Sequence, residues 1–208
     1  MKTILVTSVV LLTSFFAVSQ NSTTRTLFNG NPAKNNNITG YGAASAKLTR
    51  FADKPALMTG GYGGVLLNHG FMIGAGAYAL TNNVYVPNEK LNNNRVRYDM
   101  GYVGLVIEQM IAPHHLIHFT GNVLLGGGYV AKSEAGKKPE NLGGNQTWDR
   151  SYFYAIEPSL GVEVNTFKWM KVAVGGSYRW ISNSETPSIT DAQMSAPSGY
   201  VTLKFGKF

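Results

Sequence analysis

The sequence has no cysteine among its 208 residues, and charged residues make up only 14 % of it. The absence of cysteine excludes disulfide frameworks, thiolate catalysis and cysteine-ligated metal sites. The formal net charge is +7, and the Lys and Arg residues that produce it are scattered along the chain. They form no patch interleaved with exposed aromatic residues, so nucleic-acid binding is not indicated. Attraction to anionic lipid headgroups explains the charge at least as well.

A long apolar run occurs at the N-terminus. Lys2 precedes an apolar stretch at residues 4–18, and residues 17–19 form a small-x-small cleavage pattern. The alternative, a membrane-spanning helix, needs about 20 predominantly apolar residues, whereas this stretch is shorter and is interrupted by Thr and Ser. The pattern therefore predicts a cleaved signal peptide at residues 1–19, with the mature chain beginning at Gln20.

Glycine (24 residues) and aromatic residues (12 %) are abundant. This composition suits closely spaced strands better than helices, because each glycine inside a helix costs about 1 kcal/mol. The polar, Asn-rich segment 20–37 is predicted to be a flexible periplasmic segment. Alternating apolar and polar residues then predict eight strands, at residues 38–51, 56–67, 71–81, 95–111, 116–131, 151–165, 170–181 and 199–208.

The connections between these strands differ in length in a regular way. After a tight first break at residues 53–55, short breaks alternate with long ones. Single-chain outer-membrane barrels have an even number of antiparallel strands, short periplasmic turns and longer external loops. Residues 38–208 are therefore predicted to form an all-β, eight-stranded antiparallel up-and-down transmembrane β-barrel, with both mature termini periplasmic; a soluble sandwich has no reason to sort its connections by length. The short breaks are 68–70, 113–115 and 166–168, and the long external ones are 87–94, 132–150 and 182–198.

Side-chain alternation within each strand separates apolar from charged residues. In the segment 151–165, Ile156 and Leu160 are predicted to face lipid, while Glu157 and Glu163 point into the lumen. An eight-stranded barrel is only wide enough for side chains to fill it, so the inward charges are expected to pair and to plug the lumen. The predicted lumenal charge network is Lys47, Glu108, His118, Glu157, Glu163, Lys171, Arg179 and Lys204.

Turn positions predict which of these charges lie on directly opposite residues. Glu163 is expected opposite Lys171, and Glu108 opposite His118, since cross-strand neighbours interact directly. Tyr62 is also assigned to the lumen, together with Tyr78 on the next strand.

Aromatic residues concentrate near the predicted strand ends. Trp and Tyr gather at the two interfaces of a bilayer, because a ring is apolar while its N–H or O–H stays wet. Two girdles are therefore expected, an outer one with Trp148, Tyr152, Tyr154, Tyr178 and Trp180, and a periplasmic one with Phe71, Phe167, Trp169 and Phe208.

Motifs for catalysis, nucleotides or metals are weak. The glycine runs at 60–64 and 126–128 lack the following helix and the Gly-Lys-Ser/Thr ending of a phosphate-binding loop. His118 and Thr120, with Glu108, resemble only loosely the His-x-Ser arrangement of lipid A deacylase barrels, and they are predicted to lie far from the outer leaflet. His114, His115 and His118 have no evident fourth ligand. No catalytic residue, cofactor or metal site is predicted.

The C-terminal residues 201–208 alternate apolar and polar side chains and end on an aromatic residue. With the strand pattern, this ending resembles small OmpA- and OmpX-type outer-membrane barrels and porin-like families of unknown function. The resemblance implies that the barrel-assembly machinery recognises the last strand, with Phe205 and Phe208 as its signal. Phe208 has the opposite parity to Phe205, so either a bulge near Gly206 resets the register or the terminal ring turns inward.

The functional expectation is a non-enzymatic outer-membrane barrel with a structural or interaction role, exerted through its external loops. Outer-membrane lipids including lipopolysaccharide are expected partners, and a membrane protein is a further one. The alternatives are a narrow pore for small solutes, a lipid-modifying enzyme and a soluble lipocalin-like carrier.

Overall fold

A computed structural model describes residues 38–68, 70–91, 94–134, 147–184 and 189–208. The predicted signal peptide, the predicted flexible segment 20–37 and most of the predicted loop 132–150 lie outside these residues. Among the residues described, no helix is long and apolar enough to cross a membrane.

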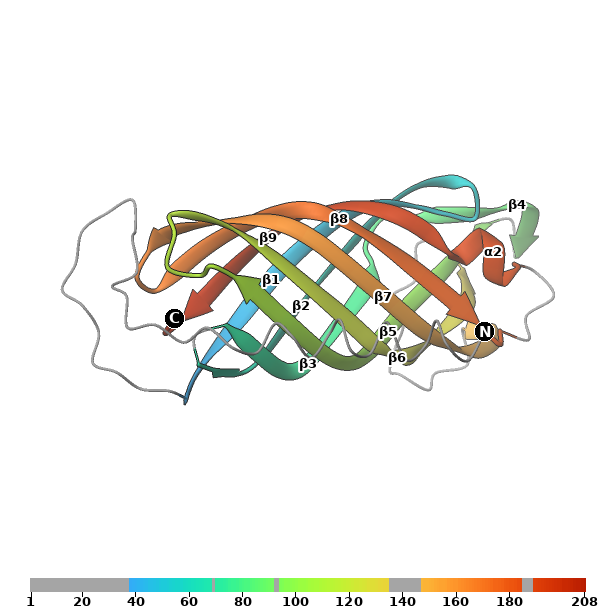
Figure 1. Cartoon of the computed structure of the whole chain (residues 1–208). Helices are drawn as coiled ribbons and strands as arrows, with labels where there is room; N and C mark the ends of the chain where they lie inside the picture. Colours follow the sequence, from blue (N-terminus) through green and yellow to red (C-terminus); the bar gives the residue numbers. More distant parts are fainter. Residues whose placement is uncertain (1–37, 69, 92–93, 135–146, 185–188) are drawn as a thin grey trace, which may run out of the picture.

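The described chain is one antiparallel sheet rolled into a closed ring (Figure 1). Strand order is β3-β2-β1-β9-β8-β7-β6-β5-β4, and pairing of β3 with β5 closes the ring of eight. The predicted eight-stranded antiparallel barrel is confirmed. The strands are β1 (Ile38–Phe51), β2 (Lys54–Leu67), β3 (Phe71–Leu80), β4 (Val84–Leu91), β5 (Asn94–Ile111), β6 (Ile117–Glu134), β7 (Thr147–Phe167), β8 (Met170–Ser182) and β9 (Ala196–Gly206).

β4 corrects the prediction of a long loop at residues 87–94. Both β3 and β4 pair with β5, β3 along residues 101–109 and β4 along residues 94–98. β3 and β4 therefore occupy the same place in the ring, beside β5, and residues 81–83 interrupt the strand between them. The Asn82 side chain fills the interruption, because its Oδ1 accepts from the Leu57 amide (2.8 Å) and its Nδ2 donates to the Pro55 carbonyl (3.2 Å).

The connections sort by length at the two ends of the barrel. The end that carries the C-terminus, called here the short-turn end, has the turns 68–70, 112–116 and 168–169. The opposite end, called the loop end, carries β4 and the short helix α2 (Asp191–Met194) (Figure 1). The β1–β2 turn at the loop end is a tight one, since Ala52 and Asp53 both have positive φ (50° and 60°), as a two-residue type I′ hairpin turn requires.

Helix α2 was not predicted within the break 182–198. It is one turn long and has a capping box, in which the Thr190 side chain accepts from the Gln193 amide and the Gln193 side chain accepts from the Thr190 amide. The Ala52 amide donates to the Gln193 carbonyl (3.0 Å), so α2 rests on the β1–β2 turn. A helix of one turn leaves no hydrophobic periodicity that a sequence pattern can detect.

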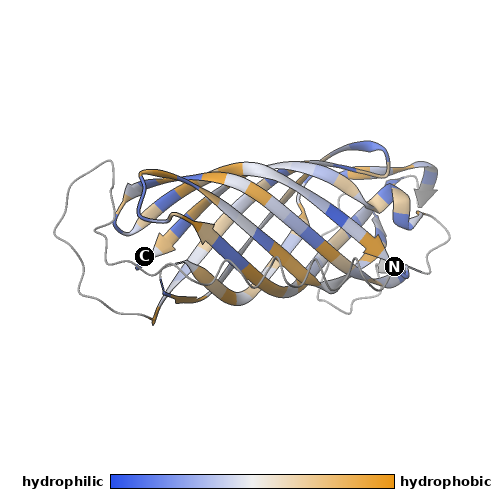
Figure 2. Cartoon of the chain, viewed as in Figure 1, coloured by the Kyte–Doolittle hydropathy of each residue, from blue (hydrophilic) through white to orange (hydrophobic). Residues whose placement is uncertain are grey.

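The wall is apolar outside and charged inside. Leu160 is 76 % exposed and Ile156 and Val174 are each 51 % exposed, whereas Glu157 and Arg179 are 1 % and 0 % exposed. Tyr62 and Tyr78 are buried, as their predicted lumenal positions require. The alternation of hydrophilic and hydrophobic residues along the strands is visible in Figure 2.

Paired glycines allow close approach of neighbouring strands. Gly64 lies opposite Gly74, and Gly104 lies opposite Gly126. A Cβ atom on Gly64 would lie 2.6 Å from the Gly74 Cα, and one on Gly104 would lie 2.8 Å from the Gly126 Cα. The glycine runs are therefore wall elements inside β2 and β6, as a strongly curved narrow barrel requires.

An apolar layer fills the barrel at the loop end. The rings of Phe51 and Tyr98 meet edge to face, with centroids 5.7 Å apart. Met194 of α2 and Ile189 just before it are fully buried in the same hydrophobic core. The connection between β8 and β9 thus helps to close the mouth of the barrel.

Candidate functional site

The eight predicted lumenal charges are all buried, with exposed fractions of 6 % or less. The structure gathers seven of them into two groups. The Glu163 cluster, near the short-turn end, contains Glu108, His118, Glu163, Lys171 and Lys204. The Glu157 cluster, closer to the loop end, contains Lys47, Tyr102, Glu157 and Ser177.

Glu163 is surrounded by three basic side chains. Its Oε1 lies 2.9 Å from His118 Nε2 and 3.2 Å from Lys171 Nζ, and its Oε2 is paired with Lys204 Nζ. These groups come from β6, β7, β8 and β9, so one carboxylate joins four consecutive strands of the wall. A buried carboxylate needs this compensation, because an unpaired charge in a dry interior is very costly.

Glu108 is linked to the same cluster through Lys204. Lys204 Nζ lies 2.5 Å from Glu108 Oε1, and the hydroxyls of Tyr41 and Tyr62 donate to the two carboxylate oxygens at 2.7 and 2.8 Å. The sequence assigned Tyr62 to the lumen but gave it no role, and Tyr41 was not singled out. Both lie on the inward parity of their strands, which is the feature of the sequence that identifies them.

Glu157 is the centre of the second cluster. Its Oε1 pairs with Lys47 Nζ (2.9 Å) and accepts from Ser177 Oγ (2.7 Å), while its Oε2 accepts from the Tyr102 hydroxyl (2.5 Å). Lys47 Nζ also lies 3.3 Å from the centroid of the Tyr78 ring, a cation–π contact. These residues come from β1, β5, β7 and β8, so the cluster joins different sides of the barrel. Its hydrogen bonds are charge-assisted, and such bonds are stronger than neutral ones.

Arg179 is bound differently from the other buried charges. Its Nε and Nη2 donate to the Met194 carbonyl at 3.0 and 2.9 Å, and Nη2 also donates to the Arg50 carbonyl (3.2 Å). Nη1 contacts Met58 Sδ at 2.8 Å. Arg179 thus fastens α2 and β1 to β8 at the loop end, and it is satisfied by main-chain oxygens and a thioether.

The predicted opposite positions were wrong for both charge pairs. Glu163 lies opposite Ala173, and Glu108 lies opposite Asn122. Lys171 nevertheless reaches Glu163 along the wall, but His118 lies opposite Glu163 and pairs with it instead of with Glu108. The reason is turn geometry: both hairpins turn one or two residues later than the sequence suggested, and each such shift changes the register.

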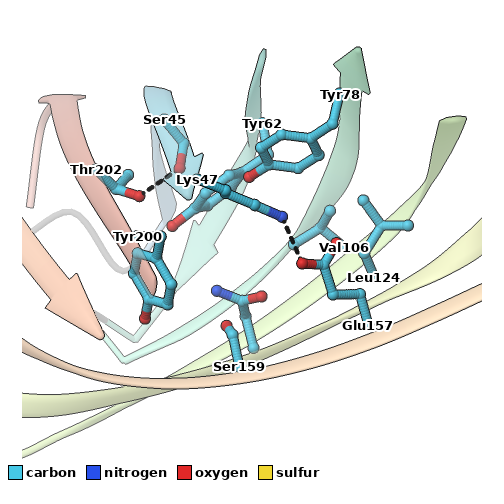
Figure 3. Close-up of a pocket in the computed structure, with 11 residues that line it drawn as sticks. Ser45, Lys47, Tyr62, Tyr78, Val106, Leu124, Glu157, Ser159, Tyr200 and Thr202 are labelled. Atoms are coloured by element: carbon cyan, nitrogen blue, oxygen red, sulfur yellow. Dashed lines mark hydrogen bonds and ion pairs between the residues drawn. The ribbon is translucent and has the colours of Figure 1, made fainter. Parts of the chain in front are cut away.

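A small cavity borders the Glu157 cluster (Figure 3), and Tyr62, which donates to Glu108 of the other cluster, lines it as well. Lys47 and Glu157 form one part of its wall, and Ser45 and Thr202 are joined by a hydrogen bond at another (2.8 Å). Within the cavity, the centre of a water molecule can occupy a volume of about 10 Å³. This is about the space of one water molecule, and it is far below the roughly 300 Å³ of an ordinary ligand pocket.

The arrangement around His118 does not assemble a hydrolytic site. Its Nε2 faces Glu163 (2.9 Å) and its Nδ1 faces the His115 carbonyl (3.3 Å), so neither ring nitrogen is directed at Thr120. Thr120 Oγ1 is buried without a hydrogen-bond partner in the described structure. A nucleophile requires an adjacent base. Within the same residues, no three His, Asp or Glu side chains are grouped as metal ligands would be.

The terminal ring turns inward, which is one of the two arrangements that the sequence left open. The centroid of the Phe208 ring lies 5.3 Å from that of Tyr41 and 4.3 Å from Lys171 Nζ. Phe205 keeps the outward parity and stacks with Trp169 on the outer wall, with centroids 6.1 Å apart. Phe208 therefore covers the short-turn side of the Glu163 cluster.

Exposed aromatic side chains lie near both ends of the outer wall. Trp169, Phe205 and the partly buried Phe167 form a stack near the short-turn end. The exposed rings nearer the loop end are those of Tyr152, Tyr154, Tyr178 and Trp180, whereas the side chain of Trp148 is outside the description.

Polar contacts join the strands beyond the aromatic side chains of the loop end. Lys132 Nζ pairs with Glu89 (2.8 Å) and Asp149 (3.4 Å), which links β6 to β4 and β7. Partial burial acts to lower the pKa of Lys132, but hydrogen bonds and attraction from the two carboxylates outweigh this and raise it. Lys54 Nζ donates to the Tyr85 carbonyl (2.6 Å), which ties β2 to β4.

Comparison with solved structures shows the fold. Neisserial surface protein A has a TM-score of 0.58 and 9 % identity, over 83 % of this chain and 98 % of that one. The N-terminal barrel of Pseudomonas aeruginosa OprF (TM-score 0.47, 8 % identity, 80 % and 96 % covered) and Ail, the attachment invasion locus protein of Yersinia pestis (0.46, 8 %, 83 % and 99 %), are also similar. No family model and no curated protein sequence matches the chain.

Proposed function

We propose that this protein is a non-enzymatic outer-membrane β-barrel whose loop end is an external interaction surface. The observation that carries the proposal is the inverted wall: large apolar side chains are exposed all along the barrel, while the Lys, Arg and Glu side chains of the two clusters, Arg179 and His118 are buried inside it. The hydrocarbon core of a membrane suits such a wall for two reasons. The exposed side chains are apolar, and a closed barrel leaves no backbone N–H or C=O group of a strand edge unpaired.

The orientation follows from the connection lengths. Three short turns and the C-terminus share one end, and the three longer connections share the other with the two-residue β1–β2 turn. In outer-membrane barrels, short turns are periplasmic and longer loops are external. We therefore propose a periplasmic location for the short-turn end and for both mature termini, and we propose that Phe205 and Phe208 are the signal read by the barrel-assembly machinery.

The interior supports a closed barrel over a pore. Two ionic clusters, the guanidinium of Arg179 and the apolar layer around Phe51 and Met194 succeed one another along the axis. The space left beside the Glu157 cluster is that of one water molecule. Steady solute passage would require several of these contacts to open together.

The loop end offers a braced surface. Contacts of Lys132 and Lys54 join β2, β4, β6 and β7 there, and Arg97 adds a hydrogen bond to Asn83 (3.0 Å) and an ion pair with Asp99 (3.4 Å). Functional residues commonly lie on loops held by a rigid scaffold. Outer-membrane lipids including lipopolysaccharide, and a membrane-protein partner, are the proposed occupants of this surface.

Fractionation and protease shaving of expressing Gram-negative cells test this proposal. The protein is expected to stay in the membrane after carbonate washing, to show heat-modifiable migration, and to be cut at the loop end, but not at the short-turn end, by external protease. Release by carbonate would indicate a soluble carrier and overturn the membrane assignment. Conductance steps from pure folded protein in planar bilayers would overturn the closed interior in favour of a pore.

A further inference from the structure

The cavity beside the Glu157 cluster has a polar wall that the protein does not satisfy by itself. Ser159 and Tyr200 both line it and lie close enough to interact with each other, yet the hydroxyl of each is buried with no partner within hydrogen-bond distance among the described residues. The Asn122 side chain lines it as well. These residues come from β7, β9 and β6, and Figure 3 shows Ser159 and Tyr200 on the side of the cavity away from Tyr78.

Leaving two buried hydroxyls unpaired is costly, and native proteins usually satisfy such groups with ordered water. Empty cavities that stay dry are apolar, whereas a polar cavity with two to four available partners binds water. This cavity has the partners, and its 10 Å³ is about the volume that the centre of one water molecule needs.

Charge and size decide which small occupant fits. A cation is disfavoured, because the ammonium of Lys47 already lies on the cavity wall and pairs with the Glu157 carboxylate there. An anion would meet the Glu157 carboxylate on the wall, and the ammonium of Lys47 is already paired with that carboxylate. Water has no charge, and it can both donate and accept hydrogen bonds.

We propose that the cavity is an internal water-binding site, in which one ordered water molecule bridges Ser159 Oγ and Tyr200 Oη and also bonds to the Asn122 side chain. The water connects β6, β7 and β9 across the interior beside the Glu157 cluster. Only the closed barrel is required for this site, so its test is separate from the test of the external role.

A high-resolution crystal structure of the folded full chain tests the site directly. We expect a density peak within about 3 Å of both Ser159 Oγ and Tyr200 Oη, the distance of an ordinary hydrogen bond. A direct hydrogen bond between Ser159 and Tyr200 with no peak beside it, or an empty cavity, overturns the proposal.

Folding equilibria in lipid vesicles provide a second test with a matched control. Ser198 is also inward, buried and without a hydrogen-bond partner, but it does not line the cavity. We expect Ser159→Ala and Tyr200→Phe each to lower the folding equilibrium constant about fivefold, the size of one lost hydrogen bond. Ser198→Ala should not lower it. Equal effects of Ser159→Ala and Ser198→Ala would show that Ser159 has no bound partner, and would overturn the proposal.

Discussion

At the scale of single residues, the buried carboxylates hold the basic side chains of the interior in place. Glu163 joins His118, Lys171 and Lys204, and it is fully buried. Removal of one partner from a buried network leaves the remaining charges without compensation, and this penalty exceeds the net value of the network itself. The effect of a substitution here is therefore set by what it leaves unpaired.

Glu163→Gln tests this reasoning. The neutral amide leaves Lys171 and Lys204 underpaired, so we expect the free energy of unfolding to fall by about 3–5 kcal/mol. Denaturant unfolding in lipid vesicles measures it. Arg50→Gln is the control, because the Arg50–Asp53 pair is exposed and such pairs contribute about 0–1 kcal/mol. Similar losses for the two variants would mean that the Glu163 cluster is hydrated rather than dry.

The tyrosine hydroxyls in the lumen are a second residue-scale feature. Tyr41→Phe removes a hydrogen bond to the Glu108 carboxylate, so we expect a loss of about 1.5–3 kcal/mol in unfolding free energy. Tyr152→Phe is the matched control, because that ring is exposed on the outer wall. The same denaturant titration compares them, and an effect of Tyr41→Phe no larger than that of Tyr152→Phe would contradict the assigned hydrogen bond.

At the scale of elements, close strand approach distinguishes one set of glycines from another. Gly104 faces Gly126 across the β5–β6 pair, and a Cβ on Gly104 would lie 2.7 Å from the carbonyl carbon of Leu125. Gly42 in β1 has nothing within 4 Å of the equivalent position. The same residue type is thus required by backbone contact in one strand and not in the other.

Gly104→Ala is therefore expected to destabilise the barrel by about 1–3 kcal/mol, the usual cost of forcing extra volume into a packed site. Gly42→Ala should change stability by less than about 1 kcal/mol, and it can be favourable because alanine restricts the unfolded chain. Urea titration of the two variants side by side measures the difference. Equal stability of the two variants would contradict the close approach of β5 and β6.

At the scale of the whole molecule, closure of the ring and inversion of the wall belong together. The β3–β5 pairing removes the sheet edges of the ring, so the exposed surface of the wall consists of side chains instead of unpaired peptide groups. Leu160 lies in the central part of β7, between Tyr152 toward the loop end and Phe167 at the short-turn end. Depth along the barrel axis therefore controls how well a charged side chain is tolerated.

Leu160→Arg is expected to cost about 2–4 kcal/mol in folding free energy, while Tyr152→Arg near the interface should cost about 0–1 kcal/mol. Folding into lipid vesicles, followed by the heat-modifiable band, measures both variants. In a barrel surrounded by water, Leu160→Arg would be harmless, and that result would contradict the membrane-spanning arrangement.

The sequence by itself determined the strand number and, outside the glycine-rich strands β2 and β3, the alternation that separates the inside of the wall from the outside. It also identified eight of the buried charged residues, but not Glu134 near the loop end. This was possible because side chains in a strand alternate with a period of two, and because turn residues mark the breaks. Inward parity also identifies Tyr41 and Tyr102, although their role as donors to Glu108 and Glu157 depends on which strands face each other.

Only the tertiary structure decided the partners. In two hairpins the register differs from the predicted one because the chain turns later, and His118 therefore pairs with Glu163 instead of Glu108. Long-range contacts turned Phe208 inward, continued β3 as β4 after Asn82, and placed α2 over the loop end. Strand alternation is a local property of the chain, whereas register, closure and pairing depend on residues far apart in sequence, which meet only once the ring has closed.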